Sequence, residues 1–130
     1  MNAVDHVDRN LDEALARGET AVAPPQLVKA MRYAVFPGGA RIRPRLCLAV
    51  GQACAGDGHA LCSSAAAIEL MHCASLVHDD LPCFDDAATR RGKPSVHAVF
   101  GERIAVLAGD ALIVLAFDTL VRGVAGHAPV

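Results

Sequence analysis

The 130-residue sequence has few aromatic residues and no excess of positive charge. It contains no tryptophan, one tyrosine and four phenylalanines, whereas alanine is abundant, which favours closely packed helices over a sheet. The formal net charge of -2 argues against nucleic acid as a general partner, because proteins that bind the phosphate backbone carry a basic excess. Hydrophobic residues make up 53% of the chain, enough to fill the core of one domain.

The cysteines and the N-terminal segment lack the patterns of disulfide-rich, zinc-binding and secreted proteins. The five cysteines are Cys47, Cys54, Cys62, Cys73 and Cys83. Their number is odd and none forms a C-x-x-C pair, so neither a disulfide framework nor a zinc site is favoured, and we expect inert thiols in a reducing cytoplasm. Asp5, Asp8 and Asp12 stand where a secretory leader would be basic and then apolar, so we expect no signal peptide.

The longest apolar run does not have the composition expected of a membrane span. Residues 104–121 are the most apolar segment, but Asp110 and Asp118 interrupt them. A spanning helix requires about 20 predominantly apolar residues. We therefore interpret this segment as a buried helix, and we expect a cytoplasmic protein without a membrane span.

Apolar residues recur at helical spacing along most of the chain. With proline and glycine as boundaries, this pattern predicts helices over residues 4–18, from 25 to the break at 37–39, from 44 to the break at 56–58, over 60–80 and over 103–122. Ser95 is a candidate N-cap for a short helix that ends at residue 100. The segment 60–80 is apolar on nearly every face, which is typical of a central helix with neighbours all round. No strand alternation or internal repeat is present, so the predicted fold class is all-α with about six helices.

Acidic residues gather directly behind the predicted central helix. Asp79 and Asp80 are followed by Pro82, then by Asp85 and Asp86. On an unbroken helix, residues six apart point about 240° away from each other. The ring of Pro82 would collide with a preceding carbonyl, so the helix must loosen there and can bring Asp85 back toward Asp79.

The adjacent Arg90 and Arg91 complete a pattern typical of diphosphate binding. Carboxylate oxygens are the ligands that Mg2+ prefers, and arginine guanidinium groups form paired hydrogen bonds with phosphate oxygens. A metal on one flank and two guanidinium groups on the other would hold a diphosphate. The alternatives are a solvated acidic loop for the aspartates and a surface ion pair for the arginines.

Three segments, in order along the chain, resemble motifs of the trans-polyprenyl diphosphate synthases. Leu76-Val77-His78-Asp79-Asp80-Leu81-Pro82-Cys83-Phe84-Asp85 with Arg90-Arg91-Gly92-Lys93-Pro94 resembles the first aspartate-rich motif in its bacterial form. Gly38-Gly39-Ala40-Arg41-Ile42-Arg43-Pro44 is similar to an upstream glycine- and arginine-containing motif, and Val106-Leu107-Ala108-Gly109-Asp110-Ala111-Leu112 to a later helix. The resemblance is strongest to bacterial geranylgeranyl diphosphate synthases of carotenoid pathways.

The resemblance implies Mg2+ as the cofactor and assigns its ligands. Asp79 and Asp85 match the magnesium ligands and are the residues implied in catalysis, with Asp80 in support. Arg90 matches a residue that binds the allylic diphosphate, and Arg91 one that binds isopentenyl diphosphate.

The resemblance also assigns residues on the two preceding helices. Arg43 and His72 match further ligands of isopentenyl diphosphate, although a lone histidine on an apolar helix is more often a core residue. Ala74 and Ser75 lie about one turn before Asp79, where side-chain size sets product length in the family. Both are small, which implies geranylgeranyl diphosphate as the product; close helix packing is the alternative role of Ala74.

Two positions depart from the family pattern. Ala40 stands where relatives usually have a lysine that contacts the diphosphate, and Arg41 is a candidate to replace that cation. Ala87 and Ala88 stand where many relatives continue with acidic residues, which leaves less negative charge beside the predicted ligands.

The resemblance implies a prenyltransferase that condenses isopentenyl diphosphate with an allylic diphosphate. It covers residues 1–130 as a single incomplete domain, the N-terminal half of the isoprenoid synthase helical bundle, so we expect the chain alone to be inactive. We expect a homodimer or association with a complete synthase, through the helix that contains residues 104–121. The alternatives are a non-catalytic fragment or partner subunit, and a His-Asp metal phosphohydrolase built on His78 and Asp79.

Overall fold

The computed structural model describes residues 2–56 and 58–125. Their secondary structure consists of α1 (Ala3–Gly18), α2 (Pro25–Val35), α3 (Ile42–Ala53), α4 (Gly58–Asp79), β1 (Thr89–Arg90), β2 (Lys93–Pro94), α5 (Val96–Phe100) and α6 (Glu102–Val124). The prediction of an all-α fold with about six helices is therefore confirmed, and one short hairpin is added to it.

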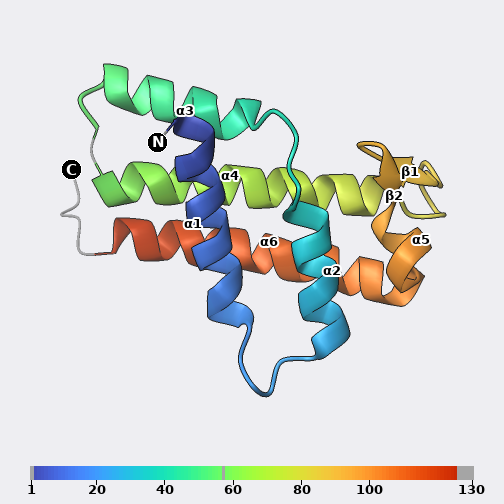
Figure 1. The fold of residues 1–130 in the computed structure, drawn as a ribbon. Coiled ribbons are helices and arrows are strands. Elements are labelled where there is room, and N and C mark those ends of the chain that lie inside the picture. Colours follow the sequence, from blue (N-terminus) through green and yellow to red (C-terminus); the bar gives the residue numbers. More distant parts are fainter. Residues whose placement is uncertain (1, 57, 126–130) are drawn as a thin grey trace.

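Helices α4 and α6 form the centre of the structure and run antiparallel, side by side (Figure 1). α3 lies along the other side of α4, while α1 and α2 cross the α4–α6 pair (Figure 1). The hairpin and α5 lie together at the end of α4 where Asp79 is located (Figure 1). The central position predicted for residues 60–80 is confirmed.

Small residues allow the central helices to approach closely. The main hydrophobic core joins α1, α2, α4 and α6 and contains Val7, Leu11, Ala14, Leu15, Val35, Ala66, Leu70, Cys73, Ala74, Leu112 and Ala116. At Gly109 of α6 a side chain would collide with the His78 ring of α4, and at Gly123 it would collide with Ser63. Glycine is therefore required at both α4–α6 contacts because any larger residue forces the helices apart.

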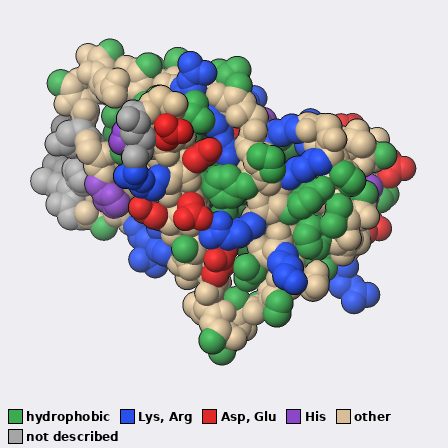
Figure 2. Space-filling model, in the orientation of Figure 1, with side chains coloured by type: hydrophobic (Ala, Val, Ile, Leu, Met, Phe, Trp, Pro, Cys, Tyr) green, Lys and Arg blue, Asp and Glu red, His purple; other side chains and the backbone are tan. Residues whose placement is uncertain are grey.

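Charged residues cover the outer face of α1. Acidic side chains follow α1 in Figure 2, with basic side chains beside them. Arg32 of α2 contacts both Asp12 and Glu19, and Asp12 Oδ1 lies 2.7 Å from Arg32 Nη1. These ion pairs join α1 to α2 across the connecting turn, and their hydrogen bonds raise the pKa of Arg32.

Helix boundaries follow the prolines, with small differences from prediction. α3 begins at Ile42, before the predicted start at Pro44, because Arg41 takes a left-handed conformation (φ 51°) that turns the chain into the helix. Pro44 then lies in the first turn, where backbone N–H groups have no partner within the helix, so the missing N–H of proline costs no hydrogen bond. Ser95 precedes α5 as predicted, but its hydroxyl donates to the Ala87 carbonyl (2.7 Å) and does not cap the helix.

The hairpin is the element that the sequence pattern did not predict. Thr89 pairs with Pro94 and Arg90 with Lys93, and the two residues between the strands have positive φ angles, 55° at Arg91 and 76° at Gly92. Two central residues with φ > 0 match the right-handed twist of the strands. Strands of two residues are too short to show an alternating pattern.

Two helices, Gly58–Asp79 and Glu102–Val124, are long and apolar enough to cross a membrane by length and composition. Half of the most apolar 18-residue stretch of α4 is buried inside the structure, and 39% of the corresponding stretch of α6 is buried. Core helices of a bundle meet the same criteria, so this is weak evidence for a span. The absence of a membrane span stays a prediction.

Candidate active site

The loop after α4 brings the backbone of Asp85 back to that of Asp79, as the position of Pro82 predicted. α4 ends at Asp79, and the backbone N–H of Asp85 donates to the Asp79 carbonyl at 2.9 Å. A second bond, from the Ala87 N–H to the Asp80 carbonyl (3.1 Å), closes the base of the loop. Asp79 and Asp85 thus start from adjacent points of the backbone, and both are exposed.

Asp80 has a different position from its neighbours. It is 2% exposed, and its carboxylate accepts two hydrogen bonds from Arg90, at 2.5 Å from Nη2 and 3.1 Å from Nε. These hydrogen bonds raise the pKa of Arg90. Asp80 therefore fixes Arg90, and both of its oxygens are engaged.

The two exposed carboxylates fit a magnesium ion that is shared with a substrate. Within residues 2–56 and 58–125, no group of three or more His, Cys, Asp or Glu side chains is arranged to hold a metal ion. Mg2+ in phosphate-transfer sites is commonly bound by only one or two carboxylates, together with substrate oxygens and water. Asp79 and Asp85 supply such a pair.

A hollow of about 310 Å3 lies beside this loop and contains four of the residues identified in the sequence. Arg43 from α3, His72 from α4 and Arg90 and Arg91 from the hairpin all line it. Arg43 Nη1 lies 3.3 Å from His72 Nε2. Three guanidinium groups around one hollow form a site for a highly charged anion such as diphosphate.

Glycine in the loop after α2 lets the backbone approach the hairpin. A Cβ atom at Gly39 would lie 3.3 Å from Arg91 Nε, closer than an ordinary contact. Gly39 and Ala40 also line the hollow, so the part of its wall that lies next to Arg91 is formed largely by backbone. An anion held there could contact backbone and guanidinium groups together.

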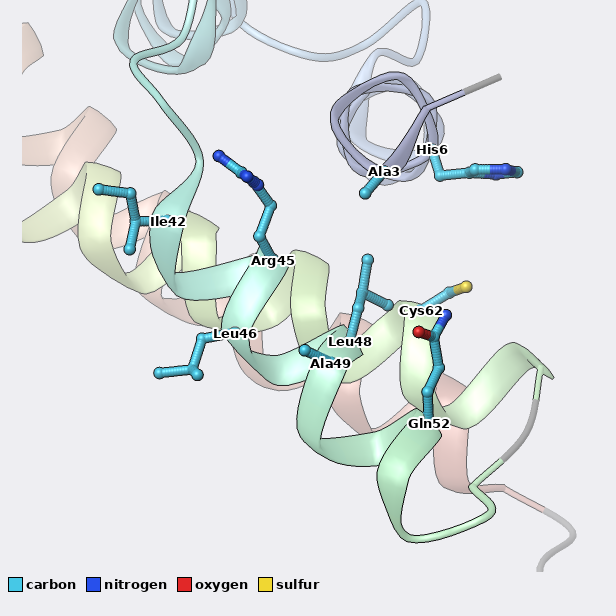
Figure 3. Close-up of a pocket in the computed structure, with 9 residues that line it drawn as sticks. All are labelled: Ala3, His6, Ile42, Arg45, Leu46, Leu48, Ala49, Gln52 and Cys62. Carbon is cyan, nitrogen blue, oxygen red and sulfur yellow. The ribbon is translucent and has the colours of Figure 1, made fainter.

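The molecule also has a larger hollow, of about 780 Å3, between α1 and α3. Figure 3 shows Ala3 of α1 above Leu48, which extends toward it from α3, while Arg45 of α3 extends upward to one side. None of the residues predicted for the site lines it. The smaller hollow is the candidate active site because it combines cationic side chains with the aspartate loop.

The model of the polyprenyl synthetase family matches residues 24–128, most of the chain. The chain belongs to the polyprenyl synthetase family. This confirms the resemblance found in the three sequence motifs.

Individual relatives agree with the family assignment. The chain is 56% identical over 120 residues to a geranylgeranyl diphosphate synthase of Cereibacter sphaeroides and 51% identical over 121 residues to one of Rhodobacter capsulatus; each match covers 92% of this chain and 42% of the relative. The crystal structure of a geranyltransferase from Legionella pneumophila matches with a TM-score of 0.90 and 40% identity, over 98% of this chain and 44% of that chain. The chain therefore spans about two fifths of the length of these polyprenyl synthetases.

Arg41 also lines the hollow, but its guanidinium group is engaged inside the protein, so the hypothesis that it replaces the missing lysine at position 40 gains no support. Its side chain is completely buried and donates to Asp8 Oδ1 (2.9 Å), Glu69 Oε1 (3.0 Å) and the Val35 carbonyl (2.8 Å). These contacts join α1, the end of α2 and α4. The guanidinium group is therefore a structural crosslink beneath the hollow and is not directed at a substrate.

Ala74 and Ser75 lie on different faces of α4. Ser75 is exposed, four residues before Asp79, and thus on the same face of the helix. Ala74 is 0% exposed and belongs to the main core. The structure therefore places Ser75 on the open face, while any role of Ala74 in product length stays a prediction.

His78 packs between helices. Its Nε2 lies 3.1 Å from the Val106 carbonyl and 3.4 Å from Asp110 Oδ1, and its ring covers Gly109. The histidine of the alternative phosphohydrolase site thus contacts α6, where it takes part in helix packing. The family assignment leaves that alternative without support.

Sequence reasoning missed two residues that shape the site. Glu69 is 2% exposed and accepts from Arg41, and Lys93 contacts the end of α2. A glutamate within an apolar helix is a signal of a buried ion pair that could have been used. Lys93 follows a glycine in a turn, and nothing in its sequence context indicates its partners.

The first prediction concerns the buried Arg41. Arg41→Met leaves Glu69 without its partner, and removing one member of a buried ion pair lowers the free energy of unfolding by about 3–5 kcal/mol. The exposed Arg45→Met is the matched control, with an expected change of less than about 0.5 kcal/mol. Urea unfolding followed by circular dichroism measures both; equal effects would show that Arg41 is not a crosslink.

The second prediction concerns the ionisation of His72. Burial and the positive charge of Arg43 lower the pKa of His72 below its ordinary value of 6.5. Arg43→Gln removes that charge, so we expect the pKa to rise toward the ordinary value, whereas Arg9→Gln on α1 leaves it unchanged. NMR titration of the imidazole signals provides the measurement.

The same shift determines how His72 contributes to stability. Because the folded chain takes up this proton less readily than the unfolded chain, the contribution falls as the pH drops through about 6.5. Arg43→Gln should reduce this dependence. A pKa of His72 that is the same in both proteins would contradict the proposed contact.

Proposed function

We propose that this chain forms the diphosphate-binding part of a Mg2+-dependent prenyltransferase that condenses isopentenyl diphosphate with an allylic diphosphate. The observation that carries the proposal is the convergence of Arg43, His72 and Arg91 on one hollow, which Arg90 also lines; Arg90 is bound by Asp80, the residue after Asp79. The names of the relatives support geranylgeranyl diphosphate as the product.

Different side chains would bind the two substrates. Asp79 and Asp85 would hold Mg2+ together with oxygens of the allylic diphosphate, and Arg90, which Asp80 keeps in place, would bind the same diphosphate. When bound, Mg2+ neutralises charge that develops on the departing diphosphate. Arg43, His72 and Arg91 would bind isopentenyl diphosphate in the hollow.

The reaction requires no side-chain nucleophile. The allylic C–O bond breaks with release of diphosphate, the double bond of isopentenyl diphosphate forms the new C–C bond, and a proton leaves. The contribution of these residues is orientation of the two substrates and stabilisation of the leaving group's charge. A neutral His72, which accepts from Arg43, leaves that guanidinium group aligned with the hollow.

We also propose a partner surface on α6, in a cytoplasmic homodimer or in association with a complete synthase. The exposed apolar side chains of this helix include Val114 (69%), Phe117 (59%) and Val121 (62%). They repeat at helical spacing on one side of α6, and contiguous exposed apolar surface is typical of an interface.

The third prediction tests metal-dependent diphosphate binding by the chain itself. We expect pyrophosphate to bind in the presence of Mg2+, and Asp79→Asn or Asp85→Asn to weaken binding at least about tenfold because a charged ligand is lost. Asp86→Asn is the matched control, since it removes one charge from the same exposed loop at a position that is not assigned to the metal. Isothermal titration calorimetry provides the affinities.

Two outcomes would contradict the proposal. Pyrophosphate binding that is unaffected by Mg2+ would exclude a metal-bridged site. Release of phosphate from diphosphate substrates, without elongation when the chain is combined with a complete synthase, would favour hydrolysis over condensation.

The fourth prediction concerns product length in a full-length synthase that carries this sequence. We expect Ser75→Phe to shift the main product from geranylgeranyl toward farnesyl diphosphate, because the ring would occupy the open face of α4 below Asp79. Ala74→Tyr should shorten the product as well, but it must displace core neighbours and should cost about 1–3 kcal/mol of stability. His59→Phe, exposed at the other end of α4, is the control. The products are resolved by chain length. The same main product from Ser75→Phe, Ala74→Tyr and the His59→Phe control would contradict the prediction.

A further inference from the structure

Lys93 connects the hairpin to the end of α2. Its ammonium group donates to the carbonyls of Tyr33 (2.6 Å) and Phe36 (2.9 Å) and lies 3.8 Å from the centre of the Tyr33 ring. The Tyr33 hydroxyl donates in turn to the Pro94 carbonyl at 2.6 Å. Carbonyls at the last turn of a helix have no partner within the helix, so a cation there satisfies them and interacts favourably with the helix dipole.

The two segments joined by Lys93 form adjoining walls of the diphosphate hollow. Lys93 pairs with Arg90 in the hairpin, and Arg91 occupies the turn between them. Phe36 begins the loop that leads to Gly39, whose backbone lies against Arg91. The ammonium group thus ties both walls together within a few residues of their closest approach.

The contacts of Lys93 differ from those of a substrate ligand. Arg90 and Arg91 line the hollow, but Lys93 does not. Its half-buried ammonium group donates to two backbone carbonyls and faces an aromatic ring, which leaves little capacity for a phosphate. Burial and the neighbouring charge of Arg91 lower the pKa of Lys93, in agreement with a position behind the arginine.

We propose that Lys93 is a positioning residue that holds the Arg91 guanidinium group against the Gly39 backbone and thereby sets the shape of the diphosphate hollow. The anchor itself follows from the contacts of Lys93, whereas its consequence for substrate binding rests on the proposed function. Without the ammonium group, the hairpin keeps the Asp80–Arg90 contact at one side, and at the other side only the Tyr33–Pro94 hydrogen bond joins it to α2. Arg91 would then move relative to Gly39.

Lys93→Met tests this inference because it keeps a long apolar stem over Tyr33 and removes the donors. Lys29→Met is the matched control: Lys29 is the chain's only other lysine and is exposed on α2. The first readout, which needs no ligand, is the NMR signal of the Arg91 Nε–H group and of the Gly39 amide. We expect both signals to shift in Lys93→Met and to stay in place in Lys29→Met.

The second readout is the affinity for pyrophosphate in the presence of Mg2+. Because a misaligned Arg91 guanidinium group would lose charge-assisted hydrogen bonds to phosphate, we expect Lys93→Met to weaken binding by about tenfold or more. Unchanged Arg91 and Gly39 signals in Lys93→Met would overturn the inference. Shifted signals with no pyrophosphate binding by the unmodified chain would support the anchor and overturn the proposed function.

Tyr33→Phe provides a second variant, should Lys93→Met fail to fold. It removes the hydroxyl that donates to Pro94 but keeps the ring beneath the ammonium group. We expect smaller shifts of the same Arg91 and Gly39 signals, in the same direction. Signals identical to those of the unmodified chain would overturn the inference in this form as well.

Discussion

The candidate site depends on the contact between the buried carboxylate of Asp80 and the guanidinium group of Arg90. Asp80 lies directly after the last residue of α4, and Arg90 lies in the hairpin, so this pair of hydrogen bonds ties the hairpin to the end of α4 across the aspartate loop. Pro82 ends any continuation of the helix, which would otherwise separate Asp79 from Asp85. Asp80 is buried and bound to Arg90, whereas the carboxylates of Asp79 and Asp85 are exposed and available to a metal ion.

Cationic side chains around the site have two distinct roles. Arg41 and Lys93 donate chiefly to groups inside the protein, and both join segments that are distant in sequence. Arg43 and Arg91 line the hollow, where an anion can reach them. The buried cations position the backbone, and the accessible ones provide the charge that a diphosphate requires.

The alanine at position 40 weakens the site's charge but leaves its frame intact. Ala40 lines the hollow, while the neighbouring Arg41 is turned inward by its left-handed backbone and held by Glu69. The three arginines that remain lie on two elements, α3 and the hairpin. Burial lowers the pKa of His72 and of Lys93, and the positive charges of Arg43 and Arg91, respectively, lower it further; a bound diphosphate would offset these charges.

The sequence by itself determined the helical class, the six helices, the break at Pro82 and the family of the chain, since each depends on local spacing or on short motifs. Only the tertiary structure decided which charged residues face inward. Asp80 and Asp79 are adjacent in sequence, yet one is buried and the other exposed, and Arg41 and Arg43 differ in the same way. The physical reason is that a charge becomes buried only where distant partners converge on it, as Asp8, Glu69 and Val35 do on Arg41, and this convergence is set by how the helices pack.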